Sequence, residues 1–191
     1  GLKLVGNTAY FFGDTKELFI VDIGDPNGLT QRPTKTLTEF PRQITLHRNN
    51  LIIAGTENPN GAVRIYDLKD PFAPQQVGQV TITREVSYLT MNGDTLYAAH
   101  TGEDTVSVID LRRLSSPNVV STITSITNPT AIIDLGNRLF VGSESGSAVN
   151  LFNTTSSTDP IAMGTFNVTG IPFDFAVKGD ALYIVNDDAS G

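Results

Sequence analysis

The stretch LIIAGTENPNGAVRIYDL, residues 51–68, joins a short apolar run through a polar loop to an alternating run that ends in an acidic residue. The same pattern occurs in three other places and starts once more near the end of the chain. The other copies are AYFFGDTKELFIVDI (9–23), LYAAHTGEDTVSVIDL (96–111), LFVGSESGSAVNLFNT (139–154) and the shorter LYIVNDDASG (182–191). The chain is therefore built from one repeated unit.

Two sets of equivalent positions measure the length of this repeat. Positions in the first run are 42, 45, 43 and 43 residues apart, at Tyr10, Ile52, Tyr97, Phe140 and Tyr183. Positions at the end of the second run are 45, 43 and 43 residues apart, at Asp22, Asp67, Asp110 and Asn153. A period of roughly 40–50 residues that holds several short strands is typical of a β-propeller blade.

Each repeat is expected to contain four antiparallel strands, which in the second copy are residues 42–46, 51–54, 62–68 and 75–82. The second strand is apolar throughout, as expected where both faces are covered, whereas the third alternates. The turns between the first two strands contain residues that tolerate positive φ, which predicts two-residue hairpins. These turns are Gly6-Asn7, Asn49-Asn50, Gly93-Asp94, Gly136-Asn137 and Gly179-Asp180.

We therefore predict an all-β fold, a β-propeller of four-stranded antiparallel blades, with about four and a half blades in one domain. The expected blade units are residues 2–40, 41–82, 83–126, 127–168 and 169–191. Because the first copy starts within its first strand and the last copy stops after its second, we expect an arc of a larger propeller with roughly six to eight blades. Such an arc would expose an apolar sheet face at each end and need further blades or partner chains for stability.

The composition limits the classes of function. With 39% hydrophobic residues, 17 Gly and 10 Pro, the chain can form a core and many turns. The net charge of −7, with 13 Lys and Arg spread along the chain, argues against binding to nucleic acid. The chain has no Cys for disulfides or thiolate metal sites, and no apolar run of about 18 residues predicts a membrane span.

Several segments resemble known propeller-forming repeats. RIYDLKDPFAPQQVGQV (64–80) and LFIVDIGDPNG (18–28) resemble LVIVD repeats. LYAAHTGEDTVSVIDL, followed by NVVSTI (118–123) and Asn128-Pro129, resembles the YVTN repeat. The resemblance covers residues 2–187. It implies a propeller from a bacterial or archaeal secreted or cell-surface protein, such as a surface-layer or adhesin-like chain. The periplasm is the alternative location. It implies no shared catalytic motif.

Two recurring residue types are given structural roles. The Asp that ends the third strand in three copies is expected to accept backbone N–H groups of the following turn, and Asn153 keeps that acceptor without the charge. A proline is expected to rigidify the start of the first strand, at a sheet edge where no donor is lost. This position holds Pro41, Val86, Pro129 and Pro172.

The loops between the second and third strands are acidic in every copy and predict a negatively charged face. The acidic loop residues are Asp14, Glu17, Glu57, Glu103, Asp104, Glu144, Asp187 and Asp188. Carboxylates on a rigid scaffold would suit a basic partner or Ca²⁺, and the alternative is a solvated rim that favours solubility. No loop has the closely spaced oxygen ligands of a dedicated Ca²⁺ site, so neither a metal nor another cofactor is predicted.

Enzymatic propellers gather carboxylates, amides or a cofactor around the central channel, near the first strands. The candidates at that place are Gln43, Tyr88, Asp134 and Asp174, with Arg42 and Glu85 nearby. Asp174 is singled out because it interrupts the apolar residues Ile171, Phe173 and Phe175. His100, beside two acidic loop residues, is a candidate base or metal ligand, but the other histidine, His47, lies in a different repeat.

No catalytic set is predicted from these residues. We expect a non-enzymatic propeller scaffold or binding module that contacts other protein chains, ligands or further blades through its loops. The alternative is a lactonase-like hydrolase or a quinone-dependent dehydrogenase whose active site lies at the channel and is completed by other blades.

Overall fold

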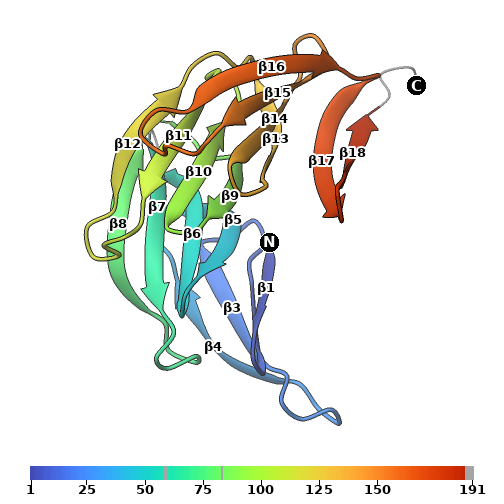
Figure 1. Cartoon of the computed structure of the whole chain (residues 1–191). Coiled ribbons are helices and arrows are strands. Elements are labelled where there is room, and N and C mark those ends of the chain that lie inside the picture. Colours follow the sequence, from blue (N-terminus) through green and yellow to red (C-terminus); the bar gives the residue numbers. More distant parts are fainter. Residues whose placement is uncertain (58–59, 83, 188–191) are drawn as a thin grey trace. The chain divides into compact units, whose positions relative to one another are not determined.

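The computed structural model describes residues 1–57, 60–82 and 84–187, and these residues form β-strands and no helix. The strands make antiparallel sheets that use them in chain order (Figure 1). Sheet 1 contains β1 (Leu2–Val5), β2 (Thr8–Phe11), β3 (Glu17–Asp22) and β4 (Thr30–Thr36), and sheet 2 contains β5 (Phe40–His47), β6 (Asn50–Glu57), β7 (Asn60–Asp67) and β8 (Gln75–Ile82). Within the described residues, therefore, the structure contains no helix that could span a membrane.

The second half of the chain continues in the same way. Sheet 3 contains β9 (Tyr88–Asn92), β10 (Thr95–His100), β11 (Thr105–Asp110) and β12 (Asn118–Ile123), and sheet 4 contains β13 (Pro129–Asp134), β14 (Arg138–Ser143), β15 (Ala148–Asn153) and β16 (Ile161–Asn167). Sheet 5 is the hairpin of β17 (Ile171–Lys178) and β18 (Ala181–Asp187). The five sheets thus follow one another in chain order, as the repeats do.

The chain divides into two compact units, Gly1–Val86 with Arg113–Pro117, and Ser87–Arg112 with Asn118–Gly191. In the first unit, β1 contacts β5. In the second, β13 contacts both β9 and β17. The first strands of successive sheets are therefore neighbours within each unit, and the sheets pack face to face as propeller blades do. The predicted propeller fold of four-stranded antiparallel blades is confirmed.

Each unit has an apolar core between its sheets. In the first unit, residues of β2 and β3 pack against residues of sheet 2. This core contains Tyr10, Leu18, Ile20, Leu37, Ile44, Leu51, Ile53, Tyr66 and Leu68. In the second unit, one core lies between sheets 3 and 4 and a smaller one around Val149 and Phe175 joins sheets 4 and 5. The apolar second strands, β6 and β10, are buried over most of their length, as predicted.

The hairpin turns follow the prediction in three of five copies. Gly6-Asn7, Gly93-Asp94 and Gly179-Asp180 form two-residue loops whose glycines have positive φ. In sheet 2 the prediction of Asn49-Asn50 was wrong by one residue, because His47 pairs with Asn50 and Arg48 takes the positive φ of 52°. In sheet 4 the loop is longer, since Asp134 pairs with Leu139.

The recurring proline marks a β-bulge. The strand register shifts between Pro41 and Gln43, and shifts again directly after Pro129 and Pro172. In each case one residue, such as Arg42, is left out of the pairing and the first strand bends. Each proline lies on an edge strand of its sheet, as predicted.

Candidate functional site

Asp14, Glu103, Asp104 and Glu144 lie in the loops between the second and third strands, whereas three others lie at strand ends beside such a loop: Glu17, Glu57 and Asp187. Asp188 lies outside the described residues. Asp14, Asp104, Glu144 and Asp187 are exposed, whereas Glu17, Glu57 and Glu103 are partly covered. Two of these carboxylates, Asp104 and Glu144, accept hydrogen bonds from Asn128 in the linker that leads into β13. These two loops are therefore held in place.

In the second unit, Asn128 ties two acidic loops together. Its backbone N–H donates to Oδ1 of Asp104 at 2.7 Å, and its Oδ1 accepts the backbone N–H of Gly102 at 2.7 Å. Its Nδ2 donates to Oε2 of Glu144. Asn128 adopts a positive φ of 44°, a conformation that asparagine tolerates better than most residues. Two predicted binding residues thus have a structural partner that sequence reasoning missed.

In the first unit, Glu57 belongs to a buried charge cluster. Nη1 of Arg64 lies 2.6 Å from Oε2 of Glu39, and Nη2 of Arg64 pairs with Oε2 of Glu57. The Glu39 side chain is fully buried, and this burial raises the pKa of its carboxyl group although Arg64 opposes the shift. Glu39 was not predicted. The available signal was Arg64 itself, because an arginine inside an apolar strand needs a carboxylate partner.

A cavity of about 240 Å³ opens beside the acidic loop of sheet 1. It is lined by Gly13, Asp14, Phe40, Pro41 and Arg42. The ammonium group of Lys16 lies 4.6 Å from the centre of the Phe40 ring and donates to the carbonyl of Thr38 at 2.8 Å.

This cavity combines a carboxylate, a guanidinium and a half-exposed phenyl ring. Nε of Arg42 lies 2.8 Å from Oε1 of Glu85, so these two predicted channel neighbours form an ion pair. Asp14 and Arg42, predicted for different places, line the same cavity. Predicted site residues of both groups meet in this cavity, and we treat it as the candidate binding site.

The predicted channel residues of the second unit are partly brought together. Asp174 is exposed on β17, and its Oδ1 accepts the backbone N–H of Phe175 at 2.8 Å. Burial raises the pKa of the Tyr88 hydroxyl on β9, and the charge of Asp174 raises it further. Gln43 lies apart from these residues in sequence, on β5 of the first unit.

Asp134, at the end of β13, has the largest electrostatic perturbation of the predicted residues. Burial raises the pKa of its carboxyl group to about 6, against the stabilising effect of two hydrogen bonds to the carboxylate. These bonds come from Oγ1 of Thr154 at 3.2 Å and from the backbone N–H of Gly136 at 2.9 Å. Burial raises the pKa of the Tyr97 hydroxyl, and the nearby Thr154 opposes that shift, so Thr154 lies between Asp134 and Tyr97 in a polar group shared by sheets 3 and 4.

The histidines lie inside the sheets. His100 is 1% exposed, and its Nε2 lies 2.8 Å from Oγ of Ser107. His47 is also buried, at the end of β5. No group of three or more His, Cys, Asp or Glu suited to a metal ion occurs within residues 1–57, 60–82 and 84–187.

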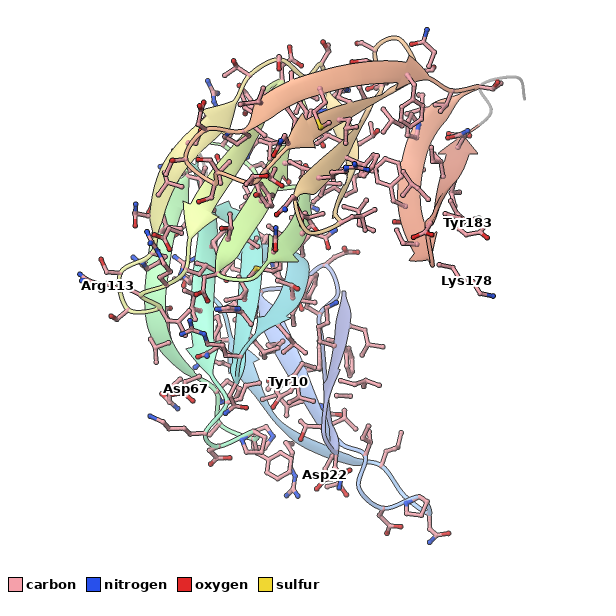
Figure 2. The ribbon with its side chains drawn as sticks, viewed as in Figure 1. Tyr10, Asp22, Asp67, Arg113, Lys178 and Tyr183 are labelled. Atoms are coloured by element: carbon pink, nitrogen blue, oxygen red, sulfur yellow. The ribbon has the colours of Figure 1, made fainter. Side chains whose placement is uncertain are left out.

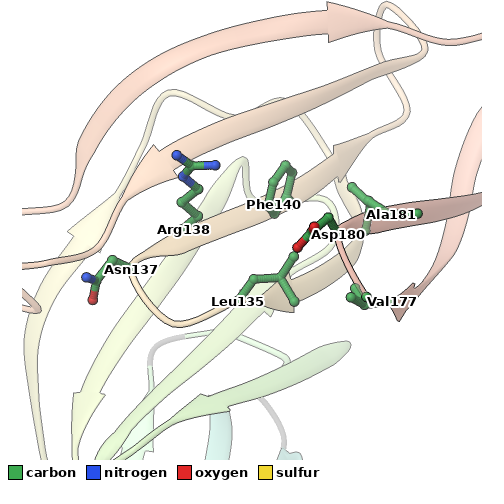
Figure 3. A pocket seen from close by; sticks show the side chains of 9 residues that line it. Leu135, Asn137, Arg138, Phe140, Val177, Asp180 and Ala181 are labelled. Atoms are coloured by element: carbon green, nitrogen blue, oxygen red, sulfur yellow. The ribbon is translucent and has the colours of Figure 1, made fainter.

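A larger cavity of about 670 Å³ lies between sheet 4 and the turn of sheet 5 (Figure 3). Its polar lining consists of Asn137, Arg138 and Asp180, and Phe140 contributes an apolar wall. Sequence reasoning assigned Asn137 and Asp180 only to hairpin turns. The cavity was missed because the pattern of a turn carries no information about which sheet lies opposite it.

No family model matches the sequence, and no curated protein matches it. Solved structures do match the fold. A functionally unknown protein from Desulfotomaculum acetoxidans has a TM-score of 0.81 at 12% identity, over 97% of this chain and 62% of its own. A protein from Lactobacillus plantarum has a TM-score of 0.81 at 14% identity, over 96% of this chain and 62% of its own.

The computationally designed Ika8 protein has a TM-score of 0.72 at 10% identity, over 96% of this chain and 54% of its own. This chain therefore spans less than two thirds of the length of these structures. The likeness establishes the fold alone, and the resemblance to LVIVD and YVTN repeats stays a prediction.

Proposed function

We propose that this chain is a non-enzymatic propeller scaffold that binds other protein chains through the loops between the second and third strands of its sheets. The observation that carries the proposal is the attachment of these loops to the linkers. In the first unit Lys16 bonds to the carbonyl of Thr38, and in the second unit Gly102 and Asp104 bond to Asn128. Loops fixed on a rigid scaffold are where binding residues usually lie.

The charge of these loops favours a basic partner. Asp14, Asp104, Glu144 and Asp187 are exposed carboxylates, and the whole chain carries a net charge of −7. A negative face raises the local concentration of cationic partners and speeds their association. The cavity beside Phe40 offers such a partner an aromatic contact next to Asp14. The proposed secreted or cell-surface location rests on the resemblance to LVIVD and YVTN repeats.

The test uses a fluorescent octalysine peptide as the probe, measured by anisotropy at low and at moderate salt. We expect salt-sensitive binding that weakens in the variant Asp14→Asn. The control is Asp25→Asn, because Asp25 lies in the turn between β3 and β4, and its side chain accepts the backbone N–H of Asn27 in the same turn. An equal loss in both variants would show nonspecific attraction to the overall charge and would contradict a loop site.

One residue, Asp174, can test the alternative proposal that the chain is part of an enzyme. Asp174 is exposed and lies near enough to Tyr88 for its charge to act on the phenol. A lactonase-like hydrolase would use such a carboxylate at the channel, and Asp174→Asn would abolish hydrolysis of a small aliphatic lactone. Under the scaffold proposal neither the wild-type chain nor the variant hydrolyses the lactone, and octalysine binding is the same in both.

A further inference from the structure

Sheet 5 has one packed face and one bare face. Tyr183 and Val185 of β18 lie opposite Ala176 and Asp174 of β17, so these four residues share one face. Tyr183 is 56% exposed and Val185 is 57% exposed. On the other face, Phe175, Leu182 and Ile184 pack against sheet 4. Figure 2 shows Tyr183 projecting outward from β18.

The residues equivalent to Tyr183 show what this face does elsewhere in the chain. Tyr10 and Tyr97 are fully buried. The hydroxyl of Tyr10 donates to the carbonyl of Pro71 at 2.7 Å, in the turn between β7 and β8 of the next sheet. The Tyr97 hydroxyl lies near enough to Thr154, in the corresponding turn of sheet 4, for Thr154 to lower its pKa against the effect of burial. At this position of the repeat, a tyrosine therefore anchors its sheet to the turn of the following sheet.

Sheet 1 has a bare face of the complementary kind. Leu2 lies opposite Phe11 and Leu4 opposite Ala9, so these side chains share a face, and Leu2 and Leu4 are 58% and 57% exposed. The equivalent residues of sheet 2 are Ile44, Leu46, Leu51 and Ile53, and all four belong to the core around Tyr10 or pack against it. Sheet 1 thus presents the surface that receives a Tyr10-type face inside the chain.

The turn that follows this bare face also matches its internal counterpart. Pro26 and Pro71 both lie four residues after the Asp that ends a third strand. In both turns the Asp before the proline accepts the backbone N–H of the residue after the proline. Asp25 accepts from Asn27 at 2.8 Å, and Asp70 accepts from Phe72 at 2.9 Å. The carbonyl of Pro26 is therefore presented in the same local turn as the carbonyl that accepts the Tyr10 hydroxyl.

We propose that the bare face of sheet 5 packs on the bare face of sheet 1 of a second copy of this chain. The contact continues the packing found between successive sheets within each unit, removes Leu2, Leu4, Phe11, Tyr183 and Val185 from water, and gives the Tyr183 hydroxyl the carbonyl of Pro26 of the second copy. Because it joins two different faces, the contact is head-to-tail and can extend beyond two copies. It uses sheet faces, and its test is independent of the loop function proposed above.

Sedimentation velocity over a range of concentrations tests the proposal. We expect the wild-type chain to associate as its concentration rises, and Tyr183→Asp and Leu4→Asp each to sediment as monomers. An equal mixture of the two variants should form a dimer that does not extend, because each variant keeps the face that the other has lost. The control is Val119→Asp, an exposed apolar residue on β12, which should leave the association unchanged.

Two further variants separate the specific contact from a loss of folding. Tyr183→Phe keeps the ring and removes one hydrogen bond worth about 1 kcal/mol, so the dissociation constant should rise about fivefold. Because the chain has no Cys, Leu4→Cys and Val185→Cys can be mixed and oxidised in air. They should give a covalent heterodimer in higher yield than Leu4→Cys mixed with Thr158→Cys. A monomeric wild-type chain, or equal yields in the two mixtures, would overturn the proposal.

Discussion

Asp67 ends β7, and its Oδ1 accepts the backbone N–H of Lys69 at 2.7 Å. The same bond recurs in the other copies, from Gly24 to Asp22 at 3.0 Å, from Arg112 to Asp110 at 2.8 Å and from Thr155 to Asn153 at 2.9 Å. Figure 2 labels Asp22 and Asp67 at these turns. The structural role predicted for this carboxylate is confirmed, because the bond needs an oxygen acceptor and no charge.

Replacing Asp67 tests the importance of that acceptor. Asp67→Ala should lower the free energy of unfolding by about 1 kcal/mol, because the N–H of Lys69 loses its partner at the turn. Asp67→Asn should stay close to wild type, since the amide oxygen can accept the same bond as Asn153 does. Urea unfolding measures both. Equal losses in the two variants would show that the negative charge, rather than the hydrogen bond, stabilises the turn.

Asp134 occupies a position of the repeat that is apolar in the other sheets. The equivalent residues there are Leu4, Leu46, Met91 and Val177. This apolar place in the repeat explains why burial raises the pKa of its carboxyl group to about 6. The folded chain therefore holds this proton more tightly than the unfolded chain, and stability falls as the pH rises from about 4 to about 6.

Asp134→Asn should remove this part of the pH dependence. The melting temperature of the variant, relative to wild type, should increase between pH 4 and pH 7, because the neutral amide has no charge to bury. Differential scanning calorimetry at several pH values measures the difference. Asp180→Asn, at an exposed hairpin turn, is the control. A constant difference across this range would contradict the effect.

The cluster of Glu39, Arg64 and Glu57 shows what sequence reasoning could not supply at the residue scale. Glu39 and Arg64 are 25 residues apart, and only the packing of the linker against β7 brings them within 2.6 Å. The local pattern predicts the role of Asp67, whose partner is two residues away. It does not predict a pair whose partners belong to different elements of the fold.

Among the elements, β7 depends on this cluster. Arg64→Met should destabilise the chain by about 3–5 kcal/mol, because it leaves the Glu39 carboxylate buried without its partner. Glu39→Gln should cost less, since the amide oxygen still accepts from Arg64, and Arg64 keeps Glu57. Chemical denaturation compares the two variants. A larger loss for Glu39→Gln would contradict the argument that the uncompensated buried carboxylate dominates.

Turns and linkers of neighbouring sheets pass the strands so closely that some strand positions have no space for a side chain. A Cβ added to Gly78 in β8 would lie 1.8 Å from the carbonyl oxygen of Leu114, and one added to Gly61 would lie 1.8 Å from that of Arg84. Both contacts are with backbone atoms, which cannot rotate away as a flexible side chain can.

Gly78→Ala should therefore lower the free energy of unfolding by about 1–3 kcal/mol or more, because the turn around Leu114 must move. The matched control is Gly28→Ala, since a Cβ at Gly28 meets no atom within 4 Å and Gly28 does not need a positive φ. Thermal unfolding followed by circular dichroism compares the variants. A Gly78→Ala chain as stable as Gly28→Ala would contradict the close approach.

The turns mark the limit of sequence reasoning at the scale of the element. The glycines in the sequence predicted three of the hairpin turns correctly, because glycine adopts positive φ without strain. In sheet 2 no glycine is available, and the register of β5 with β6 assigns the positive φ to Arg48 instead of an asparagine. Strand pairing, set by the packed apolar faces, overrides the preference of a single turn residue.

For the whole chain, the period of the repeat was sufficient to predict the fold, because each repeat forms a sheet from strands that are neighbours in sequence. The candidate site beside Phe40 was predicted only in part. Asp14 came from the charge of its loop, but the cavity depends on how β5 starts and on where Arg42 bulges from the strand. Such placements follow from contacts between repeats, which a periodic pattern does not encode.

This repeat architecture also predicts how stability is distributed along the chain. In a repeat protein each unit is stabilised by its neighbours, so the strands that are least covered by other parts of the chain should open first. The strands β6, β7, β10 and β11 are largely buried, whereas β16 and β18 are mostly exposed.

Hydrogen exchange followed by mass spectrometry, at a concentration that keeps the chain monomeric, should therefore show fast exchange in β16 and β18. Exchange should be slowest in β6 and β10, whose amides are covered on both faces. Raising the concentration should slow exchange in β18 and in β1, the strands that the contact between two copies would cover, and leave β16 unchanged. Exchange at one uniform rate through all the sheets would mean that the chain opens as a single cooperative unit, and the repeat argument would fail.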